Sequence, residues 1–329
     1  MSDDRPAINH RDKSPRAGQF EVTEKCGEAM ISPPPEPRKN PVLFGGAGLR
    51  SGWRVLLFTG LLFACIIVFG RLLGLILAPR SLRTALALSD FILFGSALVA
   101  SRIMARVEKR QRPETDYGLP LRGVLGAGFW EGGLWGFLSL SALLLILHAA
   151  GSFDYGGAAI HGVALVRSAL LWGGVFLLVS LAEEYIFRGY PLFTLAGGMG
   201  FWPAAFLLSI VFGAVHFGNP GESWLGLCNA GFIGLFFCFT RRRTGSLWFA
   251  VGAHAGWDWA ETFFYGVPDS GQKAPGHLLS PAVHGSKWLT GGSVGPEGSV
   301  LAILVIALMF AAFHLRSRVS HAAKAQPTP

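Results

Sequence analysis

Six ionisable side chains lie in stretches of sequence that are otherwise apolar. They are Glu183, Glu184, Arg188, His216, His254 and Asp258. An ionised group at the centre of a membrane-spanning helix costs ~2.5 kcal/mol or more on insertion scales. Chains retain such groups where they pair with one another, line a cavity or take part in chemistry. These six residues are therefore the candidates for a functional site.

The spacing within each motif places side chains on particular helical faces. Glu184 and Arg188 are four residues apart, so they share one face and can form a local ion pair. Glu183 points about 100° away from Glu184 around the helix, so it can face a cavity while its neighbour is neutralised. His254 and Asp258 are also four residues apart and share a face.

Two kinds of hydrolytic chemistry suit a carboxylate and two imidazoles on three helices. Glu183, His216 and His254 can bind a zinc ion, which takes imidazole nitrogen and carboxylate oxygen and lowers the pKa of its bound water to about 7. Alternatively, Glu183 and His216 activate water directly. His254 and Asp258 would then stabilise the oxyanion of a tetrahedral intermediate. Both routes cleave an acyl bond, and the sequence is compatible with either.

The elements that carry these residues are predicted to be membrane-spanning helices. Apolar and aromatic residues make up 51% of the 329-residue chain and charged residues only 15%, whereas soluble domains carry about 25% charged residues. Apolar runs near the roughly 20 residues needed to cross a bilayer recur along the chain. The expected spans are 53–77, 85–105, 129–149, 164–195, 201–217, 224–240, 244–264 and 299–315. The predicted fold class is an all-α, polytopic transmembrane helical bundle of about eight spanning helices.

Two of the motifs are expected at the same depth in this bundle. Glu183 and His216 lie on consecutive predicted helices that are joined by a glycine-rich turn at 197–200. The turn is midway between them, so straight antiparallel helices would bring both side chains to one level. His254 lies about ten residues from the basic run 241–243 at the start of its helix. Spacing alone leaves open whether His254 meets the other two.

Charges at the ends of the spans predict the orientation and the organisation of the chain. Lys and Arg gather before the first span, between the second and third, at 241–243 and after the last, so the positive-inside rule places both termini in the cytoplasm. The expected location is the cytoplasmic (inner) membrane of a bacterium. The predicted parts are a disordered polar tail (1–40), N-terminal transmembrane helices 1–3 (41–160), a catalytic transmembrane core (161–265), an extramembrane loop (266–298), and the last transmembrane helix with a short basic tail (299–329).

The basic charge of the chain does not indicate nucleic-acid binding. The net charge is +8, but the basic residues lie at span ends rather than on a face interleaved with aromatic residues. The expected partners are the lipid bilayer and a membrane-associated or lipidated protein or peptide substrate. The four cysteines lack CxxC spacing, which argues against a disulfide framework and against a zinc knuckle.

The order and separation of the motifs resemble the signature of the CPBP family, which includes the CAAX prenyl endopeptidases and the bacteriocin-processing or immunity proteins of the Abi group. The matching residues are Glu183-Glu184-x-x-x-Arg188, Phe212-x-x-x-His216 and His254-x-x-x-Asp258, within roughly 165–260. The resemblance implies a CAAX-endopeptidase-like intramembrane endopeptidase, of a family often called metalloproteases. Glu183 and His216 would activate water, and His254 with its partner would form the oxyanion site.

Asp258 differs from the residue that the prenyl endopeptidases usually carry, which is Asn. An ionised Asp cannot donate a hydrogen bond to an oxyanion. Asp258 would therefore be protonated, orient His254 as an acceptor, or bind metal.

The leading functional interpretation is an intramembrane endopeptidase that hydrolyses a peptide bond of a membrane-bound or lipidated protein with Glu/His-activated water. Zinc is a possible cofactor, and a metal-free mechanism is equally compatible. The alternatives are a non-proteolytic immunity or scaffold protein of the same fold, and a proton-coupled transporter that uses the same groups as relay sites. The sequence shows no internal repeat of the kind that many transporters have.

Overall fold

Helices form about three quarters of the described chain, which comprises residues 42–45, 48–77, 79 and 81–325 of a computed structural model. The predicted tail over 1–40 lies outside the described residues. The longer helices are α1 (Ser51–Ile76), α2 (Leu82–Val107), α4 (Ala127–Ala149), α5 (Gly162–Arg188), α6 (Tyr190–Met199), α7 (Phe201–Val215), α8 (Trp224–Thr244), α9 (Trp248–Trp259) and α11 (Val300–Ala325). The shorter ones are α3 (Pro113–Asp116), α10 (Lys287–Thr290), the 3-10 turns η1 (His216–Gly218) and η3 (Pro296–Gly298), and the π-helix η2 (Ala260–Tyr265).

Extended structure within the described residues is confined to two small antiparallel pairs. Strand β1 (Phe44–Gly45) pairs with β2 (Gly48–Leu49), just before α1. Strand β3 (Phe153–Asp154) pairs with β4 (Ala282–Val283). The second pair ties the predicted 266–298 loop to the segment between α4 and α5, so this loop is anchored to the bundle.

The all-α prediction is confirmed, and seven helical stretches of the described chain are long and apolar enough to cross a membrane. They coincide with seven of the predicted spans, and α5 and α6 together make the fourth, Gly162–Met199. The other predicted span, 244–264, corresponds to α9 and η2. There the α-helix ends at Trp259 after 12 residues, and most of its side chains are buried. α9 is therefore an internal helix of the bundle.

Pro191 explains why the fourth span is broken at the end of the charged motif. Its ring lacks an N–H and clashes with the carbonyl four residues earlier in a continuous helix. Gly189 leaves the helical region, with φ −79° and ψ −114°, and α5 ends at Arg188. Pro191 then lies in the first turn of α6, where the missing N–H is tolerated. The charged motif thus occupies the last two turns of α5.

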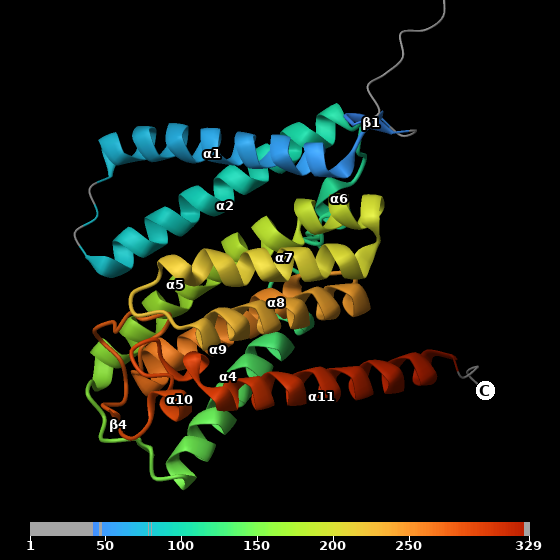
Figure 1. The fold of residues 1–329 in the computed structure, drawn as a ribbon. Coiled ribbons are helices and arrows are strands. Elements are labelled where there is room, and N and C mark those ends of the chain that lie inside the picture. The colour runs from blue at the N-terminus through green and yellow to red at the C-terminus, as the bar shows by residue number, and fades with distance from the viewer. Residues whose placement is uncertain (1–41, 46–47, 78, 80, 326–329) are drawn as a thin grey trace, which may run out of the picture. The chain divides into compact units, whose positions relative to one another are not determined.

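The helices that carry the three motifs are neighbours in the bundle (Figure 1). α5 packs against α2 and against α9, and α7 packs against α8. α9 also packs along α4. The last turns of α5, the end of α7 and the middle of α9 therefore border a common interior.

Glycines bring α4 and α9 unusually close together. A Cβ at Gly132 or Gly136 of α4 would lie 2.1 or 2.0 Å from a backbone oxygen of α9. A Cβ at Gly252 or Gly256 of α9 would lie 2.0 or 2.3 Å from a backbone oxygen of α4. Each helix thus carries a GxxxG pair, which allows helix backbones to approach closely in membranes. Because His254 lies between the two glycines of α9, this contact fixes the position of the third motif.

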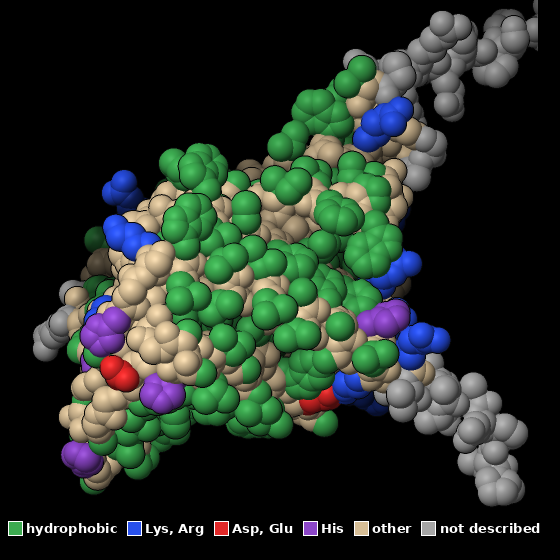
Figure 2. Space-filling model, turned by 60° about the horizontal axis from the view of Figure 1, so that its bottom comes forward, with side chains coloured by type: hydrophobic (Ala, Val, Ile, Leu, Met, Phe, Trp, Pro, Cys, Tyr) green, Lys and Arg blue, Asp and Glu red, His purple; other side chains and the backbone are tan. Residues whose placement is uncertain are grey.

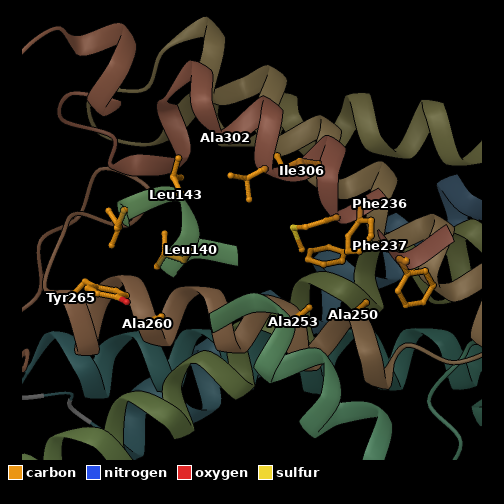
Figure 3. Packing of buried hydrophobic residues seen from close by; sticks show 14 of the residues in the cluster. Leu140, Leu143, Phe236, Phe237, Ala250, Ala253, Ala260, Tyr265, Ala302 and Ile306 are labelled. Carbon is orange, nitrogen blue, oxygen red and sulfur yellow. The ribbon is translucent and has the colours of Figure 1, made fainter. Parts of the chain in front are cut away.

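Apolar side chains fill the interior and also cover the outside of the bundle. Figure 3 shows side chains from α4, α8, α9 and α11 meeting in one core, among them Leu140, Leu143, Phe236, Phe237, Ala250, Ala253 and Ile306. Figure 2 shows a broad hydrophobic face with Lys, Arg and His side chains gathered toward its two ends. Many large apolar residues of the described chain are exposed, for example Ile67 at 62% and Ile210 at 68%. The pattern is that of a bundle surrounded by lipid.

We expect Gly132→Ala to lower the free energy of unfolding by about 1–3 kcal/mol, because the new methyl group meets backbone that cannot move aside. Gly133→Ala is the matched control. Its Cβ would lie 3.7 Å from the nearest atom, the Gly252 oxygen, so alanine should be neutral or, by its helix propensity, stabilising. Unfolding in detergent micelles measures both. Equal stability of the two variants would contradict the close contact of α4 and α9.

Candidate active site

A cavity of about 320 Å³ lies among the helices that carry the motifs. Its wall includes four of the six predicted site residues, namely Glu183, His216, His254 and Asp258. Further wall residues come from α2, α8, α11 and the 266–298 loop. Residues from distant parts of the sequence therefore face one space.

Glu184 and Arg188 lie behind the cavity wall as a fully buried ion pair. Glu184 Oε1 accepts from Arg188 Nη1 at 3.1 Å, and both side chains are 0% exposed. The guanidinium carbon of Arg188 lies 4.0 Å from the centre of the Phe212 ring, within the range of a cation–π contact. The local ion pair predicted from the i,i+4 spacing is present. Glu183 remains outside this pair and is 30% exposed on the cavity side.

His254 connects the motif on α9 with the motif on α5. Its Nδ1 lies 3.0 Å from Glu184 Oε1. Since an ionised carboxylate only accepts hydrogen bonds, Nδ1 carries the proton in this contact. Its Nε2 lies 3.4 Å from Asp258 Oδ2 and 3.8 Å from Glu183 Oε2. Phe237 stacks on the ring at a centroid distance of 5.7 Å. The imidazole is thus held on both edges and on one face.

His216 is oriented by the end of its own helix. It follows the last residue of α7 and begins the turn η1. Its Nδ1 lies 2.7 Å from the Phe212 carbonyl oxygen, which can only accept, so Nδ1 is the protonated nitrogen. Nε2 of the neutral ring then carries the lone pair. The Phe212 ring meets the imidazole edge-on at 4.8 Å. His216 is therefore set up to accept a proton at Nε2.

The three residues predicted as zinc ligands do not form a metal-binding group in this arrangement. Among the described residues, Glu183, His216 and His254 are not a set whose ligand atoms all lie within 4.8 Å of one another. Zinc–nitrogen and zinc–oxygen bonds are about 2.0–2.2 Å, which requires closer donors than that. The donor set does not fit a three-ligand zinc site.

Several wall residues could not be identified from the motifs. Asp90 of α2 lines the cavity together with Glu183, and the only signal in the sequence is a lone carboxylate in an apolar run. Asn219 and Asn229 also line it. The contact between His254 and Glu184 was not expected either, because spacing within one helix carries no information about the next.

Comparison with known proteins supports the resemblance drawn from the three motifs. Residues 165–260 match the family model described as type II CAAX prenyl endopeptidase Rce1-like. No curated protein and no solved structure matches the chain. The matched segment runs from α5 to the start of η2 and contains all six predicted site residues. Residues 165–260 therefore form a domain of the Rce1-like type II CAAX prenyl endopeptidase (CPBP) family.

Proposed function

We propose that this protein is an intramembrane endopeptidase that cleaves a peptide bond of a membrane-bound or lipidated protein. The observation that carries the proposal is the single cavity onto which Glu183, His216, His254 and Asp258 all open. Two of them, Glu183 and His216, are groups that can take a proton from water, and His254 is a group that can donate to developing negative charge. Family membership supports a membrane protease with a protein substrate in the membrane.

The proposed reaction begins with a water molecule between Glu183 and His216. These two groups remove its proton as the oxygen attacks the carbonyl carbon of the scissile peptide bond. The negative charge on the resulting oxyanion faces His254, which donates from Nε2 while its Nδ1–H remains on Glu184. Collapse of the tetrahedral intermediate breaks the C–N bond, and the abstracted proton passes to the leaving amine.

Asp258 acts in this scheme as an orienting group for His254. Its Oδ2 lies 3.4 Å from His254 Nε2, and its own side chain is only 10% exposed. An ionised carboxylate does not donate hydrogen bonds, so a direct oxyanion contact falls to His254. Glu184 orients the imidazole through Nδ1, as a second group commonly orients a catalytic histidine. The longer contact with Asp258 stabilises the positive charge of the ring and leaves the Nε2–H for the oxyanion.

The apolar part of the cavity wall fits a substrate that resides in lipid. The wall includes aliphatic and aromatic residues from six helices, among them Leu82, Leu86, Phe176, Val179, Ile306 and Met309. Ligand pockets typically combine such an apolar lining with a few convergent polar groups. The arrangement can accommodate an apolar segment or a lipid chain beside the reactive groups.

Profiling of new N-termini in host membranes tests the proposal. Membranes that carry the wild type are compared with membranes that carry Glu183→Ala at equal abundance. Cleavage products that depend on Glu183 would support proteolysis and identify the substrate. Identical profiles from two folded proteins would reject it in favour of a non-proteolytic immunity or scaffold role, and substrate-dependent proton flux in liposomes would favour a transporter.

We expect His216→Asn to lower kcat by about 10²–10⁴-fold, the usual contribution of a positioned acid–base group. Asparagine keeps an N–H near the position of Nδ1, so the bond to the Phe212 carbonyl and the fold should survive. His148→Asn is the matched control, because His148 Nδ1 faces the Phe153 carbonyl oxygen at the same 2.7 Å and His148 is not in the cavity wall. Equal activity of the two variants would contradict a role for His216 Nε2.

A further inference from the structure

Three carboxylates meet beyond the end of α9, outside the matched family segment. Glu261 lies in η2, Asp269 in the loop that follows, and Glu297 in η3. One oxygen from each lies within 4.8 Å of the other two. Within the described chain, no Lys, Arg or His forms an ion pair with any of the three. Three acids therefore lie together without a directly paired cationic side chain among the described residues.

Each carboxylate uses one oxygen for a protein donor. Glu261 Oε2 accepts from Trp257 Nε1 at 2.7 Å. Asp269 Oδ2 accepts from the Thr262 hydroxyl at 2.9 Å, and Glu297 Oε1 accepts from the Ser270 amide at 2.6 Å. These bonds orient all three groups and leave Oε1 of Glu261 for another ligand.

The second oxygen of Glu261 is buried without a partner. The residue is 0% exposed, and its Oε1 has no hydrogen-bond donor. A buried carboxylate oxygen in this state carries a desolvation cost that a ligand would remove. The atom is directed at the turn that leads into η3, because a Cβ on Gly295 would lie 3.0 Å from it. The unpartnered oxygen thus points toward the segment that carries Glu297.

Gly295 also brings a backbone oxygen into this space. Its φ of +120° is a conformation that favours glycine. A Cβ there would lie 2.1 Å from the Pro268 carbonyl oxygen. The turn therefore allows the carbonyl before Asp269 and the Glu261 carboxylate to converge on the same small volume.

Burial disfavours the ionised forms of the two loop carboxylates, Asp269 and Glu297. Partial burial raises the pKa of Asp269 to about 6. Burial together with the negative charge of Asp269 raises the pKa of Glu297 to about 8. Carboxylates that repel one another in this way are neutralised by protons or by a cation.

We propose that Glu261, Asp269 and Glu297 bind a Ca²⁺ ion. The donors are all oxygen, which suits a hard cation rather than zinc. Ca²⁺–oxygen bonds of about 2.3–2.6 Å allow ligand oxygens to lie up to about 5 Å apart, in line with the observed spacing. Mg²⁺ holds its ligands closer and usually keeps several of its waters rather than entering an all-protein cage.

The cation would join the end of the α9–η2 segment to the 266–298 loop. Asp269 and Glu297 also line the cavity that contains Glu183 and His254. Ca²⁺ binding would therefore fix the part of the loop that forms the cavity wall. The predicted topology of eight crossings, in which α9 and η2 make the seventh, places this loop on the outer side of the membrane, where modules that bind Ca²⁺ at 10⁻⁴–10⁻³ M are typical. This inference does not depend on proteolysis.

Terbium luminescence tests the site on the full-length protein. Tb³⁺ replaces Ca²⁺ in oxygen sites, and Trp257, which donates to Glu261, lies close enough to sensitise its emission. We expect chelator-treated protein in detergent to give tryptophan-sensitised Tb³⁺ emission that CaCl₂ displaces. A Ca²⁺ concentration of about 100 times Kd should also raise the Tm by roughly 5 °C.

Glu297→Gln should weaken Tb³⁺ and Ca²⁺ binding at least tenfold, and Asp269→Asn serves as the second variant in case the first does not fold. Asp154→Asn is the control, because Asp154 is an exposed carboxylate in β3 that pairs with His284 outside the cluster. Wild-type protein without Ca²⁺-displaceable emission would overturn the proposal, as would site variants that bind like the wild type. Neither result would bear on the protease assignment.

Discussion

Glu183→Gln is expected to lower kcat by about 10²–10⁴-fold while the Tm stays close to that of the wild type. Glutamine keeps the size and one acceptor oxygen of glutamate but cannot take a proton from water. The fold should tolerate the change, because Glu183 is 30% exposed to the cavity and its ion-pair contact with His254 is 3.8 Å long. The measurement is single-turnover cleavage of the substrate found by N-terminal profiling.

Glu222→Gln is the control for the loss of a carboxylate from the same cavity. Glu222 also lines the wall, and its Oε1 accepts from the Ser223 amide at 2.7 Å, a bond that glutamine can keep. We expect this variant to remain within a few-fold of the wild type. If both variants lose activity equally, the cavity needs negative charge in general and Glu183 has no special role. If neither variant loses activity, a group other than Glu183 activates the water.

Hydrophobicity and charge spacing predicted most of the fold because they report local properties. The seven apolar spans and the i,i+4 ion pair of Glu184 with Arg188 follow from composition and helical geometry within single segments. The length of α9 was harder to predict. Its α-helix has 12 residues and is enclosed by other helices, so the thickness of a bilayer does not set its length. Burial of that kind is decided by neighbours that are distant in sequence.

The contacts between helices could not be predicted from the sequence for the same reason. His254 meets Glu184 only because the glycine pairs of α4 and α9 set the position of α9. The GxxxG spacing in 132–136 and 252–256 is visible in the sequence, but the sequence does not indicate that the two glycine pairs face each other. The carboxylates Glu261, Asp269 and Glu297 likewise come together only through the course of a long loop.

Arg188→Met is expected to lower the free energy of unfolding by about 3–5 kcal/mol, the cost of breaking a buried ion pair by removing one partner. Glu184 and Arg188 are both 0% exposed, so water cannot replace the lost guanidinium. Methionine retains apolar volume beside Phe212, which separates the effect of charge from the effect of a cavity. Unfolding in mixed micelles gives the free energy.

The double variant Glu184→Gln with Arg188→Met shows which property of the pair matters. Replacing both charges removes the unpaired buried carboxylate, so most of the lost stability should return. Glutamine Oε1 can still accept from His254 Nδ1, which keeps the imidazole oriented. If the double variant is as unstable as Arg188→Met alone, the guanidinium stabilises the fold through the Phe212 ring, 4.0 Å away, rather than through Glu184. Recovered stability would instead show that the second Glu of the motif and its Arg act as one neutral unit that supports His254 from behind the cavity wall.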